Sequence, residues 1–127
     1  MAKMIPSEIG YYEHKSGEDQ MFTALSKLPD DYYVFHSYRV VTIAGNTLNE
    51  NEADFLVFSP KYGCLVIEAK QGHVYRDETG DWFYQNGIKM KDPFDQACTS
   101  MYAILNKLKE NVSPEMCKLL SNCKFLF

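Results

Sequence analysis

Two apolar runs joined by a turn-forming segment make up residues 52–70, EADFLVFSPKYGCLVIEAK. Short runs rich in Val, Ile, Leu and Phe predict strands, and the proline and glycine within Ser59–Gly63 predict a turn between them. We therefore expect a β-hairpin. If that hairpin is symmetric about Lys61, Asp54 on the first strand lies opposite Glu68 on the second.

The carboxylates of Asp54 and Glu68 would repel each other in this register. Directly opposed side chains lie roughly 4.5–5.5 Å apart at Cβ, and like charges there destabilise a sheet. A cation between them would remove the repulsion, and Mg²⁺ prefers oxygen ligands. Because side chains alternate along a strand, Lys70 lies on the same face as Glu68 and could orient water or offset phosphate charge. The set suits metal-dependent hydrolysis of a phosphodiester.

Two plainer interpretations of these residues stay open. An aspartate at a strand start and a Glu-x-Lys at a strand end also occur as ordinary solvated strand ends. The same register places Glu52 opposite Lys70, so the lysine could simply be ion-paired with Glu52.

Length and composition predict one domain with a packed core, since 46% of the 127 residues are hydrophobic. No apolar run is long enough to span a membrane and no secretory signal is present, so we expect a cytoplasmic protein without a membrane partner. The net charge of −4 argues mildly against nucleic-acid binding, although a bound metal can dominate the local field. Four cysteines without C-x-x-C spacing indicate reduced thiols rather than a zinc site.

The remaining elements follow from amphipathic patterns, β-branched runs and capping residues. Before the hairpin we expect an irregular segment over 1–15, a helix over 17–28 capped by Ser16, and a strand over 32–43. After it we expect short strands over 73–76 and 81–85, with a hairpin turn at Asn86-Gly87. A long helix should begin at Pro93 after Asp92, and a short helix and a strand should follow Ser113. The long helix should bury Phe94, Ala97, Met101, Ile104, Leu105 and Leu108.

Four further side chains have both a functional and a structural interpretation. Glu18 lies in the first turn of its helix, where it could serve a site or interact with the helix dipole. Gln96 could reach a phosphate or water, or be an ordinary surface glutamine. His36 is expected to be structural or exposed rather than catalytic, and Trp82 to pack, with base stacking as the alternative.

The ordered set of motifs resembles the PD-(D/E)xK nuclease superfamily, and more closely the nuclease-related domain (NERD) family. The matching stretches are Gly17-Glu18, Glu52–Val57, Gly63–Lys70, Gly72, Trp82 and Asp92–Gln96. The resemblance implies a restriction-endonuclease-like α/β core, a central mixed β-sheet flanked by α-helices. It also implies Asp54 and Glu68 as metal ligands, Lys70 as the catalytic lysine, and Glu18 and Gln96 as accessory residues of the active site. Ala53 stands where the superfamily signature has proline.

The leading prediction is therefore a nuclease domain that hydrolyses DNA with Mg²⁺ or Mn²⁺. Such domains often accompany a helicase, kinase or topoisomerase-type module on a longer chain. We expect an N-terminal irregular segment over 1–16 and the nuclease-related domain over 17–110. Residues 111–127 are expected to be the start of further structure of such a longer chain. One alternative is a nuclease-like module that docks nucleic acid or protein without cleaving it. Another is a regulatory domain with no nucleic-acid role.

Overall fold

The computed structural model describes residues 1–9 and 16–127, and its centre is a five-stranded sheet of order β1-β2-β3-β4-β8. The sheet is mixed, because the pairs β1–β2 and β4–β8 are parallel and the pairs between them antiparallel. Its strands are β1 (Lys3–Ile5), β2 (Tyr33–Ala44), β3 (Thr47–Ser59), β4 (Gly63–Ile67) and β8 (Phe125–Leu126).

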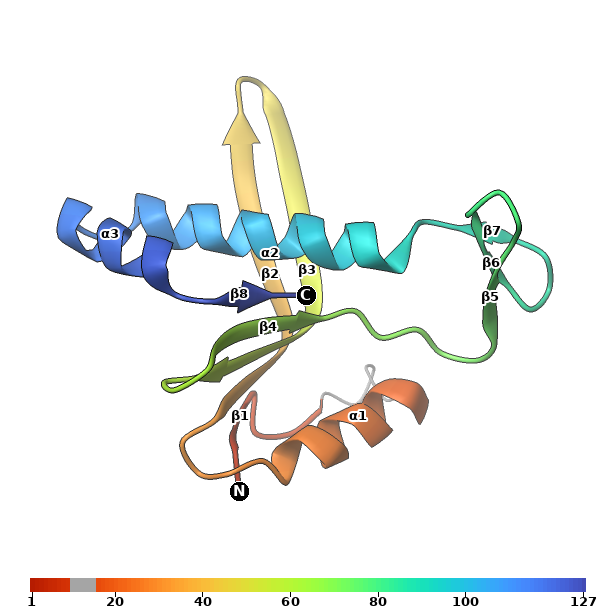
Figure 1. Ribbon diagram of the computed structural model, residues 1–127, viewed down its shortest axis with the longest axis horizontal. Coiled ribbons are helices and arrows are strands. Elements are labelled where there is room, and N and C mark those ends of the chain that lie inside the picture. The colour runs from red at the N-terminus through yellow and green to blue at the C-terminus, as the bar shows by residue number, and fades with distance from the viewer. Residues whose placement is uncertain (10–15) are drawn as a thin grey trace.

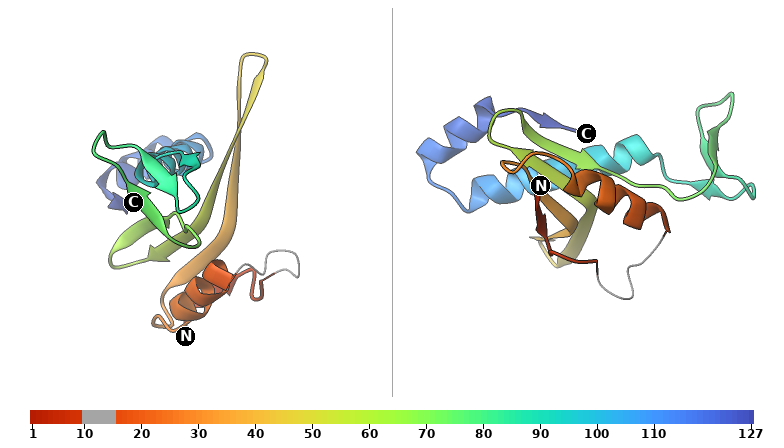
Figure 2. Two further views of the ribbon diagram at one scale, coloured as in Figure 1. Left: turned by 90° about the vertical axis from the view of Figure 1, so that its right-hand side faces the viewer. Right: turned by 90° about the horizontal axis from the view of Figure 1, so that it is seen from below.

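Helices cover both faces of this sheet (Figure 1). α1 (Ser16–Ser26) packs on one face, whereas α2 (Pro93–Glu110) and α3 (Pro114–Asn122) lie on the other, as the turned views of Figure 2 also show. None of these helices, within the described part of the chain, is long and apolar enough to cross a membrane. The predicted restriction-endonuclease-like α/β core is confirmed.

The hairpin formed by β3 and β4 has the predicted register. Phe55 pairs with Ile67 and Ser59 with Gly63, which is the symmetry expected about Lys61. The ladder ends at Ile67, so Glu68 and the residues after it lie just past the strand rather than within it.

Residues 3–5 form a strand where an irregular segment was expected. β1 pairs in parallel with the start of β2, and the N–H of Lys3 donates to the carbonyl of Tyr32 at 2.9 Å. Ala2 is buried in the core on the α1 side. Three residues are too few to show a period, so this tertiary pairing left no clear signal in the sequence. Residues 10–15 of the expected segment lie outside the described residues.

Two apolar cores pack on the two faces of the sheet. The core under α1 comprises Ala2, Val34, Phe55 and Val57, packed against Met21, Phe22, Leu25 and Leu28. The core under α2 comprises Val40, Ala53, Leu56, Val66, Ala97, Met101 and Ile104.

The strands β2 and β3 change face halfway along their length. Val34 belongs to the core under α1 and Val40 to the core under α2, although regular alternation would place both on one face. The change occurs at Ser37, whose φ is +54°, and the ladder passes from the pair His36–Phe55 directly to the pair Tyr38–Ala53. Beyond this point the two strands continue as a ribbon that projects from the sheet (Figure 1). Asp54, opposite Ser37, therefore lies at a break in the pleat.

A second, three-stranded antiparallel sheet precedes α2. It consists of β5 (Val74–Arg76), β6 (Trp82–Tyr84) and β7 (Lys89–Met90), as predicted for the first two strands and for the Asn86-Gly87 turn.

The helix α2 begins after Asp92, whose carboxylate accepts the N–H of Phe94 at 2.8 Å, as predicted for an N-cap. The buried side chains of this helix are Ala97, Ser100, Met101 and Ile104. Phe94 was expected to be buried and is instead 61% exposed, because the first turn extends beyond the sheet and its ring contacts Trp82 of the small sheet.

Candidate functional site

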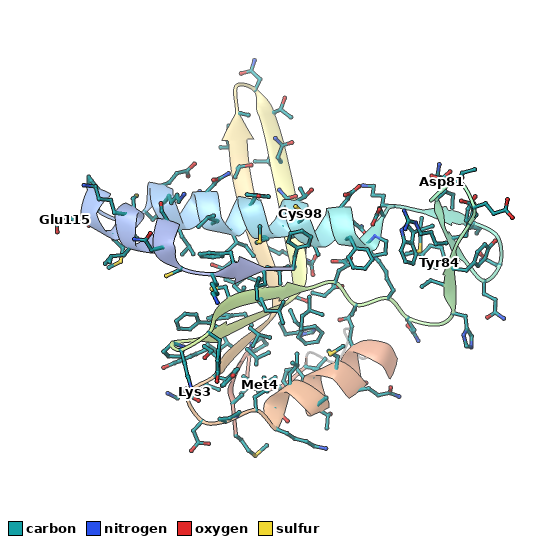
Figure 3. The ribbon with its side chains drawn as sticks, viewed as in Figure 1. Lys3, Met4, Asp81, Tyr84, Cys98 and Glu115 are labelled. Atoms are coloured by element: carbon teal, nitrogen blue, oxygen red, sulfur yellow. The ribbon has the colours of Figure 1, made fainter. Side chains whose placement is uncertain are left out.

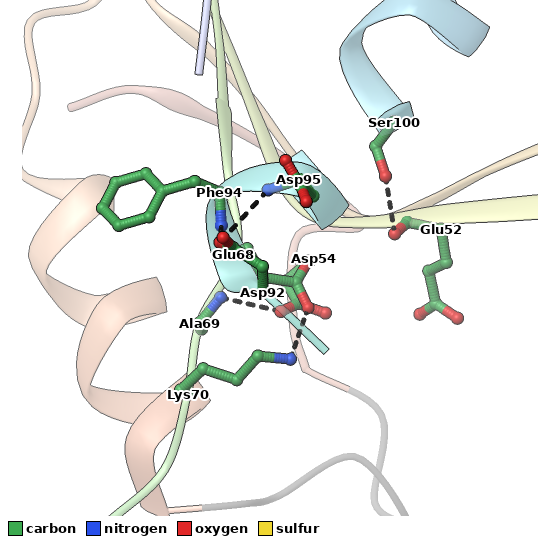
Figure 4. Close-up of polar contacts among 9 residues, drawn as sticks. All are labelled: Glu52, Asp54, Glu68, Ala69, Lys70, Asp92, Phe94, Asp95 and Ser100. Atoms are coloured by element: carbon green, nitrogen blue, oxygen red, sulfur yellow. Dashed lines mark hydrogen bonds and ion pairs between the residues drawn. The ribbon is translucent and has the colours of Figure 1, made fainter. Parts of the chain in front are cut away.

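Charged side chains converge where the open end of the β3–β4 hairpin meets α1 (Figure 4). Asp54 Oδ2 accepts the backbone N–H of Ala69 at 2.8 Å. Lys70 Nζ donates to Glu68 Oε1 at 2.8 Å, and the two side chains are only 20% and 11% exposed. The pleat is broken at Asp54 and the ladder ends at Ile67. The side chains of Asp54, Glu68 and Lys70 therefore point toward one another rather than to opposite faces of the sheet.

Four of the predicted site residues line one cavity of about 600 Å³. Its lining residues are Glu18, Asp54, Glu68 and Lys70, with Gly17, Met21, Ala69, Gln71 and Tyr84. Glu18 comes from α1, so the cavity joins a helix on one face of the sheet to the edge of the hairpin.

The fifth predicted residue, Gln96, lies in an adjoining hollow of about 510 Å³. Glu68 lines both hollows, so it forms the boundary between them. The Gln96 Oε1 atom is buried, and no described residue donates a hydrogen bond to it. Gln96 is therefore a neighbour of the cluster around Asp54 rather than one of its members, and the described residues leave its buried acceptor unsatisfied.

The surroundings of Asp54 raise its pKa to about 6. Burial is the largest cause, because it removes water from the charged form. The negative charges of Glu68 and Glu18 raise the pKa further, while the N–H of Ala69 and the ammonium of Lys70 lower it. The protein alone therefore stabilises the Asp54 carboxylate less well than water does.

A buried histidine positions Glu18. The Glu18 Oε2 atom lies 3.0 Å from His36 Nε2, and the His36 side chain is fully buried. The imidazole sits between the rings of Phe22 and Phe55, with ring centroids 6.0 and 5.0 Å away. This placement agrees with the structural role expected for His36 and adds a specific consequence, since the ring fixes one carboxylate oxygen of a cavity residue.

The alternative pairing of Lys70 with Glu52 is wrong. The Glu52 carboxylate lies 3.5 Å from Arg39 Nε, and its backbone carbonyl accepts the Ser100 hydroxyl at 3.3 Å. Figure 4 shows Glu52 apart from the cluster that Lys70 joins. The physical reason is that the ladder ends at Ile67, before position 70 could pair across the hairpin.

Asp54 and Glu68 could hold a divalent cation together. Among residues 1–9 and 16–127, no group of three or more His, Cys, Asp or Glu side chains is arranged to hold a metal ion. Mg²⁺, however, is usually bound by one or two carboxylates, with water and substrate phosphate completing its octahedron. One oxygen of each carboxylate already accepts a hydrogen bond, and each has a second oxygen to offer. The donor set therefore fits Mg²⁺ better than a metal that needs a complete protein cage.

Sequence reasoning missed two participants in this site. The backbone N–H of Ala69 carries no side-chain signal at all. Tyr84 reaches the cavity from the small sheet, and the aromatic run Trp82–Tyr84 indicated only a strand.

The fold places the chain among α/β domains with a restriction-endonuclease-like core. Comparison with protein families narrows this class, because the model of the nuclease-related domain (NERD) matches residues 13–121. That match covers most of the chain, so the chain belongs to the nuclease-related domain family. No curated protein and no solved structure matches it.

Proposed function

We propose that this domain hydrolyses phosphodiester bonds of DNA with Mg²⁺ held by Asp54 and Glu68. The observation that carries the proposal is the convergence of Glu18, Asp54, Glu68 and Lys70 on one cavity. Membership of the nuclease-related domain family supports a nuclease-related function independently of that geometry. Strongly perturbed carboxylates in a cavity are typical of functional sites, and the raised pKa of Asp54 adds to the case.

Each side chain has a distinct role in this proposal. The ion would supply electrophilic stabilisation of charge on the phosphate, and Mn²⁺ could replace Mg²⁺ because both are bound by oxygen ligands. Glu18, held by His36, would orient the attacking water or accept its proton. Gln96 would turn its buried amide oxygen toward the adjoining hollow and accept a hydrogen bond from a water there.

Lys70 would change partner when the site fills. Its ammonium now compensates the charge of Glu68 in a poorly solvated pair. A cation beside Glu68 would take over this compensation, so the three donors of Lys70 could turn to a phosphate oxygen. Lys70 is thus a donor to substrate in the loaded site rather than a permanent partner of Glu68.

The test is cleavage of single-stranded, duplex and branched DNA with and without Mg²⁺ or Mn²⁺. Glu68→Ala should lower the metal-dependent rate about 10²-fold or more. The matched control is Glu110→Ala, a carboxylate that pairs with Lys107 at the C-terminal end of α2 and lines neither hollow, and it should retain most of the activity. Thermal unfolding of both variants checks that each remains folded.

A nuclease-like docking module is the second candidate, and the close Lys70–Glu68 pair favours it, because that pair is complete without a metal. If the folded protein binds DNA but cleaves no substrate with either cation, this candidate replaces the first. With either function, we expect the domain to work beside a helicase module.

A further inference from the structure

Aromatic side chains lie on both faces of the small sheet β5-β6-β7, of which Tyr84 is labelled in Figure 3. Its ladders pair Val74 with Tyr84, and Trp82 with both Arg76 and Met90. Because side chains alternate along each strand, these five side chains share one face. Tyr75, Phe83 and Lys89 share the other.

Tyr84 brings one face of the small sheet to the cavity, and we call Trp82 and Tyr84 of that face, together with Phe94 at the start of α2, the site-side face. Tyr84 lines the same cavity as Asp54 and Lys70. Trp82 lies beside Phe94, with ring centroids 5.9 Å apart and ring planes inclined by 53°.

Part of this aromatic surface is accessible. Tyr84 is 38% exposed and Phe94 is 61% exposed, so each ring has a surface that the protein does not cover. On the opposite face Tyr75 is 47% exposed and stacks on Phe83 at 5.4 Å and 18°, but neither of these rings lines the cavity. The two faces therefore differ in position rather than in exposure, and the site-side face is the one whose exposed Tyr84 ring lies beside the cavity.

The charge of this region differs from that of the whole chain. Residues 70–91 contain four Lys and Arg against three Asp and Glu, whereas the whole chain has a net charge of −4. Lys70 lies in the cavity and Lys91 lines the adjoining hollow, so an ammonium borders the small sheet at each end. The small sheet therefore does not share the net negative charge of the whole chain, although the Lys70 ammonium is paired with Glu68.

We propose that the site-side face stacks on unpaired bases of the nucleic-acid strand whose phosphate enters the cavity, which makes single-stranded nucleic acid the preferred substrate. The inference rests on the proposed function for the position of that phosphate. Aromatic rings bind any base, since every base has a π-face, whereas the bases of a duplex are already stacked on one another. Tyr84 is the key residue, because among residues 1–9 and 16–127 it alone belongs to both the small sheet and the cavity lining.

Trp82 supplies a direct readout, because it is the only tryptophan of the chain. Its emission is followed while oligothymidylate of about 12 nucleotides, or a duplex of similar length, is added without divalent cations. Anisotropy of a labelled oligonucleotide gives the affinity independently. We expect quenching by the single strand, and an affinity for it about tenfold or more above that for the duplex.

Three variants make the test specific to the face. Tyr84→Leu should weaken single-strand binding about tenfold, while Tyr84→Phe, which keeps the ring, should bind like the wild type. Tyr75→Leu, the matched control on the opposite face, should leave the affinity within about twofold. Circular dichroism confirms that the variants are folded.

The inference is overturned if single strands bind without changing Trp82 emission, or if Tyr75→Leu and Tyr84→Leu weaken single-strand binding equally. It is also overturned if duplex binds as tightly as single strands, or if no nucleic acid binds. Cleavage with Mg²⁺ is measured separately on the same variants. Stacking without any cleavage would sink the proposed hydrolysis and leave the stacking face in place, and cleavage without stacking would do the reverse.

Discussion

The two ends of the β3–β4 hairpin border hollows of similar size and opposite character. The closed end, at Ser59–Gly63, borders an apolar cavity of about 660 Å³ whose described lining includes Lys61 but no carboxylate. The open end borders the cavity of about 600 Å³ that contains Asp54 and Glu68. Size would favour the closed end. Convergent charged groups favour the open end, and these are the groups that can bind a cation and a phosphate.

Burial acts on both ends but with different results. At the closed end, burial raises the pKa of the Cys64 thiol to about 11, so the thiol stays protonated at neutral pH. At the open end, burial combines with two neighbouring carboxylates to bring the pKa of Asp54 to about 6. Burial thus brings the pKa of Asp54 close to physiological pH at the open end, whereas it moves the pKa of Cys64 away from physiological pH at the closed end.

The largest expected effect is a loss of cleavage, and it distinguishes the role of Lys70 from that of Glu68 at the open end. Lys70→Ala should lower cleavage about 10³-fold while leaving metal affinity nearly unchanged, because a protonated lysine donates hydrogen bonds and cannot ligate a cation. Glu68→Ala should lose both cleavage and metal affinity. Calorimetric titration with Mn²⁺ beside a cleavage assay gives both quantities, and an equal loss of metal affinity in the two variants would show that Lys70 has another role.

At the closed end, Ile104→Ala should lower the free energy of unfolding by about 3 kcal/mol and spare the metal affinity. Ile104 is 2% exposed, belongs to the core under α2 and lines the apolar cavity. Denaturant unfolding measures the loss, and Mn²⁺ titration of the folded variant measures the affinity. A variant that stays folded but no longer binds Mn²⁺ would mean that the two ends of the hairpin are energetically coupled.

The pH dependence of stability is the third test, made on the metal-free protein. Because the folded pKa of Asp54 is raised, the native state holds its proton more tightly than the unfolded chain does. Stability from this group is therefore complete below about pH 4 and is lost as pH rises through about 6. The pKa shift alone would correspond to a loss of about 3 kcal/mol in the free energy of unfolding. Because the carboxylate is partly exposed, screening by water reduces this loss to roughly 1–2 kcal/mol.

Asp54→Asn is the matched variant for this test. It keeps an oxygen that can accept the N–H of Ala69 and removes the charge, so above pH 7 it should be as stable as the wild type or more so. Added Mg²⁺ should stabilise the wild type and have no effect on the variant, with an ionic-strength control. If Asp54→Asn clearly destabilises the metal-free protein and Mg²⁺ changes nothing, Asp54 is a structural residue.

The hairpin register could be predicted because two apolar runs flank a single turn-forming segment, which leaves one symmetric solution. From that register the proximity of Asp54, Glu68 and Lys70 followed. The partner of Lys70 did not follow, since it depends on the ladder ending at Ile67.

Other parts of the site depend on contacts between distant segments. The bond from His36 to Glu18 joins β2 to α1, and Tyr84 reaches the cavity from a separate sheet. A periodicity of two or of 3.6 residues predicts on which face of its own strand or helix a residue lies. It does not predict which other strand or helix that residue will contact. The change of face at Ser37 breaks that periodicity outright.

The smallest expected effect concerns Ser37, whose left-handed backbone marks the change of face directly after His36, the partner of Glu18. Glycine adopts positive φ without steric cost but loses more backbone entropy on folding. These two terms, each about 0.5–1 kcal/mol, oppose each other, so Ser37→Gly should leave stability nearly unchanged. The matched control is Thr42→Gly on the same strand, where no positive φ is relieved and stability should fall by about 1 kcal/mol. Equal losses in the two variants, measured by urea unfolding, would mean that Ser37 stores no strain and that the change of face is imposed by the packing of the two cores.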